Sequence, residues 1–262
     1  MRSSSSSEDA FDYPPLDAHA HVDVAIAPRD LLSLRAVVLA ATRSIAEHEQ
    51  TLNRRDPLAI WGVGVHPGVP TAIASFDPRR CRTLLRRASL LSEVGLDGRS
   101  SVGLVEQRRV MSAALDIHDE LPCFASVHSA SRTAEVVELL SGHRCSTVIL
   151  HWWRGSRDET REAVKLGCYF SFNPRDAKRG SVLDIVPVDR VLTETDHPYG
   201  DLGLAVSAPG ATAAVEARLN PTNPAAARLQ VWSNFRRLAE EAGVMDRLPS
   251  KIAGLALAAP RS

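Results

Sequence analysis

Histidines and carboxylates recur along the sequence at places where short apolar segments end. The first two, His19 and His21, are two residues apart, so on a strand both side chains point to the same face. The others follow at wider intervals: His66, Glu93, His128, His151 and Asp196. Imidazoles and carboxylates are metal ligands, and two ions about 3.5–4 Å apart can clamp both the attacking and the leaving oxygen of a displacement.

Taken together, these residues supply enough donors for two divalent ions. Four histidines and two carboxylates form the proposed ligand set: His19, His21, His128, His151, Glu93 and Asp196. A carboxylate such as Glu93 can bridge two ions. Each residue alone also fits a structural role, as a hydrogen-bonded loop residue, a helix cap or an ion-pair partner. Six such groups at successive strand ends are hard to explain as independent accidents, so the sequence predicts a metal site.

The elements that must position these residues alternate between strands and helices. Short apolar runs predict strands over 16–22, 35–40, 60–66, 90–95, 123–128, 147–152, 168–173 and 190–196. Helical spacing of apolar residues predicts helices over 107–118, 132–140, 157–166 and 225–242. Eight strands in this length predict an α/β fold, a (β/α)₈ TIM barrel, whose strand ends all open on one face and there carry the active site. A doubly wound open sheet is the alternative, which is weakened because no GxGxxG loop follows the first strand.

Composition excludes several functional classes. Lys and Arg number 31, as do Asp and Glu, so the formal net charge is zero and a whole-molecule basic footprint for nucleic acid is absent. Apolar stretches fall far short of the roughly 20 residues that span a bilayer, and the first residues carry no secretory signal. Four cysteines without a CxxC pair argue against a disulfide framework and favour a cytoplasmic protein.

The chain is expected to form one catalytic domain over 14–262, preceded by a disordered Ser-rich tail over 1–13. Cys123 and Cys168 lie in apolar runs and are expected to be buried. His48 and His118 fall on helical stretches and are expected to be solvated. Five arginines between 79 and 87 should form a basic face on a helix, away from the barrel mouth.

The ordered motifs resemble the TatD family of metal-dependent deoxyribonucleases, which have a TIM-barrel fold. The resemblance runs from about residue 16 to 240, and its motifs are Asp17-Ala-His-Ala-His21, Gly64-Val-His-Pro67, Glu93-Val-Gly-Leu-Asp97, Val127-His-Ser129, His151-Trp-Trp-Arg-Gly-Ser156 and Glu194-Thr-Asp-His-Pro-Tyr199. Further details, such as Gly167-Cys-Tyr-Phe-Ser-Phe-Asn-Pro174, resemble the QatD branch, whose members are TatD-like nucleases of the Qat anti-phage systems. Members of that branch are encoded beside an ATPase and a QueC-like protein.

The resemblance also implies roles for individual residues. His19, His21 and Asp196 would hold one metal, and His128 and His151 the second. Glu93 would bridge the two, His66 would contact the substrate phosphate, and Asp196 would also take a proton from the attacking water.

Two departures from the family pattern concern phosphate contacts. The family usually has Arg directly after the His-Ser of strand 5, whereas this chain has Ala130 there and Arg132 two residues later. Arg154 stands where the family has Ser, and it either binds phosphate or is a surface residue. None of the metal-ligand positions is lost.

These observations predict a two-metal phosphodiesterase that hydrolyses DNA, with a single strand or a strand end as the expected substrate. One alternative is an amidohydrolase acting on a small cyclic amide or ester, but many such enzymes bridge their metals with a modified Lys, and no Lys lies near Glu93. Another alternative is a non-catalytic subunit of a defence complex. The sequence leaves open whether the ions are Zn²⁺, Mn²⁺ or Mg²⁺, and the polarity of digestion.

Overall fold

The computed structural model describes residues 13–178, 182–201 and 208–261. The expected tail lies outside the described residues except for Tyr13. The Tyr13 ring is buried, with its centroid 5.6 Å from that of Trp232, so the described chain is packed from its first residue.

All eight predicted strands are present in the described residues, and all neighbouring strands are parallel. They are β1 (Leu16–Ala20), β2 (Val37–Ala40), β3 (Ala59–Trp61), β4 (Leu90–Gly95), β5 (Phe124–His128), β6 (Val148–Leu150), β7 (Tyr169–Phe172) and β8 (Val191–Thr193). Most are shorter at the carboxyl end than the apolar runs indicated. Strands β3, β6 and β8 end before the predicted site residue, so His66, His151 and Asp196 lie in the loops that follow these strands.

The strands close into a barrel, which excludes the open sheet. The ladders run β1-β2-β3 and β4-β5-β6-β7-β8, and a parallel bridge between Val63 and Leu91 joins the two groups. On the other side, the Asp196 amide donates to the His19 carbonyl at 2.9 Å and the His21 amide to the His197 carbonyl at 2.8 Å. These bonds connect the segment after β8 to β1, so the carboxyl ends of all eight strands surround one opening, the barrel mouth.

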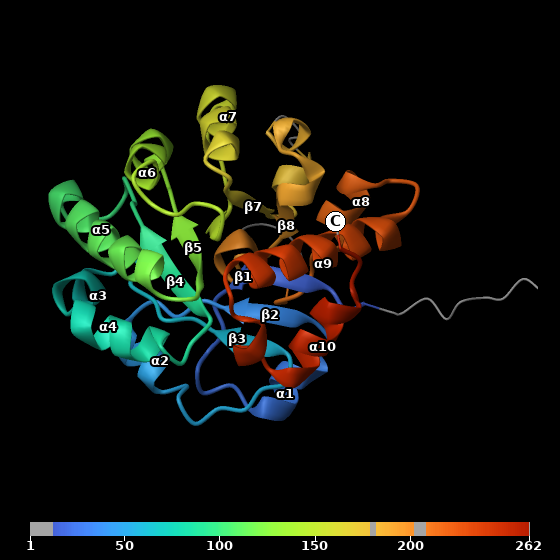
Figure 1. Cartoon of the computed structure of the whole chain (residues 1–262), viewed down its shortest axis with the longest axis horizontal. Coiled ribbons are helices and arrows are strands. Elements are labelled where there is room, and N and C mark those ends of the chain that lie inside the picture. The colour runs from blue at the N-terminus through green and yellow to red at the C-terminus, as the bar shows by residue number, and fades with distance from the viewer. Residues whose placement is uncertain (1–12, 179–181, 202–207, 262) are drawn as a thin grey trace, which may run out of the picture.

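Helices surround the strands (Figure 1). They are α1 (Pro28–Ser33), α2 (Ile45–Glu49), α3 (Pro70–Ala74), α4 (Pro78–Leu85), α5 (Leu104–Glu120), α6 (Thr133–Leu140), α7 (Arg157–Lys165), α8 (Ala213–Leu219), α9 (Pro224–Glu241) and α10 (Ser250–Ala258). Short 3₁₀ turns are η1 (Asp176–Lys178), η2 (Leu183–Ile185), η3 (Val188–Arg190), η4 (Tyr199–Asp201) and η5 (Met245–Arg247). The four helices that the sequence predicted correspond to α5, α6, α7 and α9. No helix of the described chain is long and apolar enough to cross a membrane.

The barrel interior is layered from apolar to polar. Five buried side chains, one from each strand between β4 and β8, pack in one cluster with residues of α9 and α10: Leu90, Phe124, Ile149, Tyr169 and Leu192. Two residues after Phe124 and Leu192 stand Ser126, on β5, and Glu194, directly after β8, and both are also buried. Since side chains of a strand alternate between faces, these polar groups lie above the apolar layer, towards the mouth.

Two histidines that the sequence predicted to be solvated are buried. These are His48 and His118, and each ring makes a hydrogen bond inside the fold that compensates for its loss of contact with water. The His48 Nδ1 lies 2.8 Å from the Gly62 carbonyl, and the His118 Nε2 lies 2.9 Å from the Thr147 hydroxyl. Their helices turn these rings inward, which spacing alone did not indicate. All four cysteines are buried free thiols, which confirms the expectation for Cys123 and Cys168.

One glycine permits the close approach of β4 and β5 at the mouth. Gly95 has a φ of 148°, and a Cβ placed on it would lie 2.0 Å from the His128 carbonyl oxygen. No side chain fits there unless the two strands move apart. Because Glu93 and His128 lie on these two strands, Gly95 also sets how close they come.

We therefore predict that Gly95→Ala destabilises the fold by roughly 3 kcal/mol, through overpacking in an unsuitable backbone conformation. For a chain of this size this lowers Tm by about 6–12 °C in a thermal melt. Gly254→Ala is the matched control, because nothing lies within 4 Å of the added Cβ in α10. It should leave Tm unchanged or raise it slightly. Equal melting temperatures for both variants would contradict the packing argument.

Candidate metal centre

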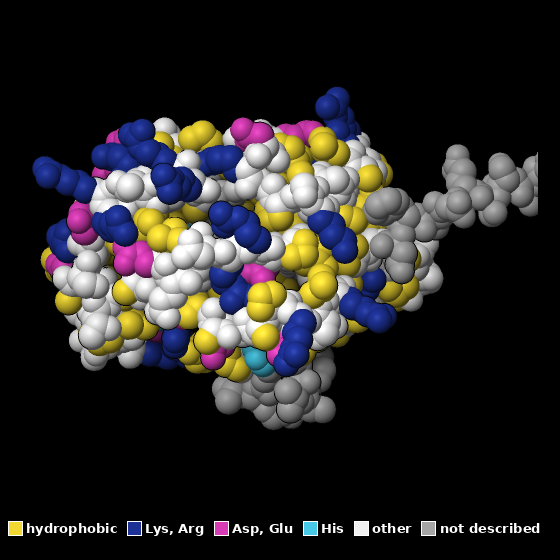
Figure 2. Space-filling model, turned by 90° about the horizontal axis from the view of Figure 1, so that it is seen from below, with side chains coloured by type: hydrophobic (Ala, Val, Ile, Leu, Met, Phe, Trp, Pro, Cys, Tyr) yellow, Lys and Arg dark blue, Asp and Glu magenta, His cyan; other side chains and the backbone are white. Residues whose placement is uncertain are grey.

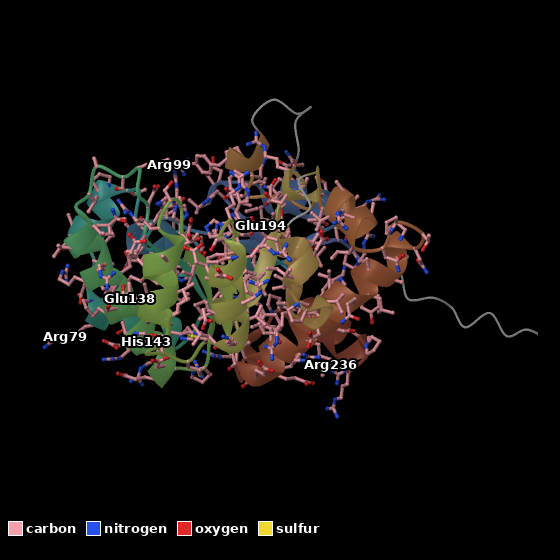
Figure 3. All side chains as sticks on the ribbon, turned by 90° about the horizontal axis from the view of Figure 1, so that it is seen from above. Arg79, Arg99, Glu138, His143, Glu194 and Arg236 are labelled. Carbon is pink, nitrogen blue, oxygen red and sulfur yellow. The ribbon has the colours of Figure 1, made fainter. Side chains whose placement is uncertain are left out.

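Glu93 occupies the centre of the barrel mouth. Its side chain is fully buried, and five imidazoles, those of His19, His21, His66, His128 and His151, reach within 3.6 Å of its carboxylate. In Figure 3, Glu194 lies near the middle of the molecule, Arg99, which lines the cavity, lies at the upper edge, and His143 and Arg236 lie toward the lower edge.

The Oε2 atom of Glu93 faces the first group of donors. It lies 3.5 Å from the His19 Nε2 and 3.2 Å from the His21 Nε2. The same two nitrogens lie 3.8 Å and 3.6 Å from the Asp196 Oδ1. The structure thus brings together the set that the sequence assigned to one metal.

The Oε1 atom of Glu93 faces a second group. It lies 2.6 Å from the His128 Nδ1 and 2.8 Å from the His151 Nε2, and these two nitrogens are 3.1 Å apart. The two oxygens of one carboxylate therefore point to different pairs of imidazoles.

The donor set fits divalent cations. With bonds of about 2.0–2.2 Å, donor atoms on one ion lie roughly 3–3.5 Å apart. The separations in the first group match this range or slightly exceed it, and those in the second are at or below it. Buried His19 Nε2 and Glu93 Oε2 have no hydrogen-bond partner among the described residues. Three triads have donor atoms within 4.8 Å of one another: His19 with Glu93 and His151, His19 with His21 and Asp196, and His21 with His66 and Glu93.

Hydrogen bonds behind the rings fix the direction of two ligands. The His21 Nδ1 lies 3.0 Å from the Ala41 carbonyl, which can only accept, so this nitrogen carries the proton and Nε2 keeps a free lone pair. The His19 Nδ1 lies 2.7 Å from the Ser126 hydroxyl. Such outer contacts orient metal-binding histidines and set their tautomer.

His66 has the opposite tautomer. Its Nδ1 accepts a hydrogen bond of 2.8 Å from the Gly68 amide, so the proton of the neutral ring sits on Nε2. That nitrogen faces the Glu93 Oε2 at 3.6 Å. A protonated Nε2 can donate to an anion but has no lone pair for a metal. The geometry thus sets His66 apart from His21, although both lie close to Glu93.

Burial and neighbouring charges shift the pKa values of the site. Burial alone would raise the pKa of Glu93, but the surrounding imidazoles outweigh it and hold that pKa well below its usual value. Burial lowers the pKa of His19 to about 4 and of His151 to about 3, so both rings are neutral at pH 7. Burial also opposes protonation of His128, but the charges of Glu93 and Asp97 raise its pKa to about 9. Without metal, His128 therefore keeps its proton at pH 7.

Asp196 and Glu194 share the segment that follows β8. Asp196 has a φ of 50°, and burial followed by the nearby Glu93 charge raises its pKa to about 7. Burial raises the pKa of Glu194 well above its usual value, and this side chain accepts a hydrogen bond from Ser171. One Glu194 oxygen lies 3.9 Å from the His151 Nδ1, on the side of the ring away from Glu93.

Asp17 fastens the segment after β8 to β1. It accepts hydrogen bonds from the Thr195 amide at 2.9 Å, the Thr195 hydroxyl at 2.6 Å and the Gly210 amide at 2.8 Å. Because Thr195 precedes Asp196, this contact holds Asp196 in place beside His19 and His21.

A cavity of about 680 Å³ opens above the cluster. Its lining includes His21, His66, Glu93, His128, His151 and Asp196, together with Arg43, Arg99, Arg154, Trp152 and Tyr199. Arg154, a predicted phosphate contact, thus lies at the cavity. Arg132 does not line it: its guanidinium is 3.0 Å from the Glu135 carboxylate on α6.

Several site residues were absent from the predicted set. Ser126 stands two residues before the predicted ligand His128 on β5, so strand alternation could have found it. Glu194 lies beyond the end of β8, where strand alternation does not apply. Arg43 and Arg99 come from loops and Tyr199 begins the 3₁₀ turn η4, and no periodic signal in the sequence places them.

Comparison with known proteins gives a consistent result. A family model described as TatD related DNase matches residues 16–240. The chain is 29% identical over 147 residues to the 3'-5' ssDNA/RNA exonuclease TatD of Cronobacter sakazakii, covering 52% of this chain and 56% of that protein. It is 27% identical over 190 residues to the corresponding exonuclease of Enterobacter lignolyticus, covering 68% and 73%. The match thus spans little more than half the length of the first of these relatives.

Solved structures share the fold. The TatD homologue YJJV of Escherichia coli K12 aligns with a TM-score of 0.69 at 20% identity, over 86% of this chain and 97% of that one. A hydrolase of the TatD family from Entamoeba histolytica aligns with a TM-score of 0.67 at 13% identity, over 86% and 98%.

The two tautomers lead to a prediction for metal binding. We expect His21→Ala to weaken Mn²⁺ binding by roughly 10- to 100-fold or more, because a lone pair aimed at the cluster is removed. His66→Ala should leave the number of bound ions and their affinity near those of the unchanged protein. Titration calorimetry on metal-stripped protein measures both. Loss of an ion in His66→Ala would show that this ring is a ligand.

Proposed function

Because the chain belongs to the TatD-related DNase family, we propose that it hydrolyses phosphodiester bonds of DNA with two divalent ions held at the barrel mouth. The observation that carries the proposal is the orientation of the Glu93 carboxylate. Its Oε2 faces His19 and His21, and its Oε1 faces His128 and His151. One ion would bind His19, His21 and Asp196, the other would bind His128 and His151, and Glu93 would bridge them. When bound, such ions lower the pKa of a water towards neutrality and neutralise charge on phosphoryl oxygens.

Two residues would act on protons and on the phosphate. The His66 Nε2–H, fixed by the Gly68 amide, would donate to a phosphate oxygen. Asp196, whose Oδ1 lies 3.6 Å from the His21 Nε2, would accept a proton from the attacking water.

The cavity suits a single strand or a strand end better than a duplex. Its volume of about 680 Å³ admits a single-stranded segment of at most a few nucleotides. Arg43, Arg99 and Arg154 on its lining can contact the phosphates of such a segment. On the face shown in Figure 2, basic side chains are scattered among apolar and acidic ones, and the formal net charge of the whole chain is zero. The positive field that binds a polyanion would then be local to the mouth. The relatives named as ssDNA/RNA exonucleases support the same substrate class.

We propose further that the protein acts in an anti-phage defence system of the Qat type, together with an ATPase and a QueC-like protein. The support is the resemblance of its motifs, among them Gly167-Cys-Tyr-Phe-Ser-Phe-Asn-Pro174, to the QatD branch. Four free buried thiols fit a protein of the reducing cytoplasm. Co-purification of the tagged chain with both partners, expressed from one operon, tests this assignment independently of nuclease activity.

Replacement of the bridging carboxylate is the direct test of the proposed chemistry. We expect Glu93→Gln to lower kcat on a single-stranded oligonucleotide by roughly 1,000-fold or more, because several kcal/mol of transition-state stabilisation depend on the ions. Glu135→Gln, which alters an acid outside the cavity, should keep full activity. Unchanged turnover with two ions bound in Glu93→Gln would exclude bridging, and hydrolysis of cyclic amides without any DNA cleavage by the unaltered protein would favour an amidohydrolase.

The pH dependence should move with metal concentration. His128 has a pKa raised to about 9, so below that pH the metal-free site holds a proton that a metal must displace. Activity at low Mn²⁺ should therefore fall as pH drops. Raising Mn²⁺ should shift this acid limb to lower pH, because the ion then outcompetes the proton. We would measure kcat/KM against pH at several Mn²⁺ concentrations; a limb that stays fixed over a hundredfold range of metal would contradict the histidine site.

A further inference from the structure

Trp152 places an aromatic ring beside the reacting centre. It directly follows His151 and lines the cavity above Glu93. Its φ of 40° lies in the left-handed region, which a bulky residue seldom adopts. Among the described residues, Ser131 and Asp196 at the same cavity share a positive φ. Such conformations persist where the surroundings enforce them, often at binding sites.

The ring offers its hydrocarbon surface to the cavity. The indole Nε1 is buried and has no hydrogen-bond partner in the described part of the chain, although the residue as a whole is partly exposed. The polar edge is thus covered, and the accessible part of the ring is carbon.

A guanidinium already rests against this ring. The Arg154 Cζ lies 5.0 Å from the ring centroid, and the Arg175 Cζ lies 6.0 Å from it. Arg154 also lines the cavity, and its side chain is 47% exposed, with the Asp176 carboxylate 3.6 Å away. A flat cation on a tryptophan shows that the ring accepts a planar, delocalised group.

We propose that Trp152 is the stacking platform for the nucleobase next to the scissile phosphodiester, and that this contact selects unpaired strands. The inference rests on the proposed function for its substrate class. Every base has a π-face, so stacking holds a strand without reading its sequence. A base inside a duplex is covered by its neighbours and cannot stack on a side chain. As a base takes its place on the ring, Arg154 moves from the indole to the phosphate that flanks that base.

The position of the ring supports this role. Trp152 directly follows His151, whose Nε2 lies 2.8 Å from the Glu93 Oε1, and all three residues line the same cavity, so a base on the ring would lie beside the proposed metal centre. Arg43 and Arg99 line the same cavity from the loops after β2 and β4. An aromatic face flanked by guanidinium groups suits alternating bases and phosphates better than it suits a peptide or a lipid.

The test compares Trp152→Leu and Trp152→Phe with the unaltered protein. Leu keeps apolar bulk but removes the aromatic face, whereas Phe keeps a face. Trp61→Leu is the matched control, because Trp61 also has an arginine against its ring, the Arg54 Cζ at 4.9 Å, but does not line the cavity.

Three single-stranded oligodeoxynucleotides serve as probes: one unmodified, one with an abasic residue at the 5' end and one with it at the 3' end. Binding is measured by fluorescence anisotropy in a chelator, and cleavage in Mn²⁺. For the unmodified strand, Trp152→Leu should weaken binding and raise KM by roughly 5- to 150-fold, the range that one stacked base contributes. Trp152→Phe should recover most of this loss, and Trp61→Leu should match the unaltered protein.

The abasic strands separate stacking from a structural role. One end of the oligonucleotide should place its base on Trp152. Removal of the base at that end should weaken binding to the unaltered protein, but it should not weaken binding to Trp152→Leu any further. An equal loss on every strand, or wild-type binding in Trp152→Leu, would overturn the proposal. If the unaltered protein cleaves no DNA but binds it through Trp152, the proposed function fails and the platform stands. If it cleaves DNA without any dependence on Trp152, only the platform fails.

Discussion

The site depends on how a fully buried carboxylate, that of Glu93, keeps its charge. Burial of an isolated carboxylate costs many kcal/mol, so such a group must be paired or bind a metal. Around Glu93 the imidazoles hold its pKa well below its usual value, and His128, whose pKa is raised to about 9, places a positive charge 2.6 Å from its Oε1. Most of these rings are themselves neutral at pH 7, since burial lowers the pKa of His19, His66 and His151. A cluster that combines neutral imidazoles with a charged carboxylate and with Asp196 has the composition that divalent cations require.

The barrel makes this arrangement possible by separating its interior into layers. Apolar side chains such as Phe124 and Leu192 fill the lower part, and the residues two positions later turn polar. Ser126 then orients His19, and Glu194 lies behind His151. Asp17 connects the last strand segment to the first. The proposed ligands lie on β1, β4 and β5, directly after β1, and in the loops after β6 and β8, and they meet because parallel strands all end at one opening.

Much of the fold and of the proposed ligand set could be predicted from the sequence, since the two patterns that indicate them are local. Apolar runs separated by amphipathic stretches indicate a barrel, and polar residues at the ends of runs indicate its mouth. Tertiary context decides the rest. His48 and His118 lie in helical patterns yet are buried by single hydrogen bonds. Arg132 follows the expected strand but turns to Glu135, while Arg43 and Arg99 reach the cavity from loops whose conformation no periodicity fixes. Tautomers, such as that of His66, depend on a backbone amide and are visible only in three dimensions.

The central claim is that the two oxygens of Glu93 serve two ions. Anomalous diffraction from crystals soaked in Mn²⁺, recorded at the manganese edge, tests it most directly. The account predicts two peaks about 3.5–4 Å apart on either side of the Glu93 carboxylate. One peak should lie beside His19, His21 and Asp196, and the other beside His128 and His151. A single peak, or a peak bonded to His66, would contradict it.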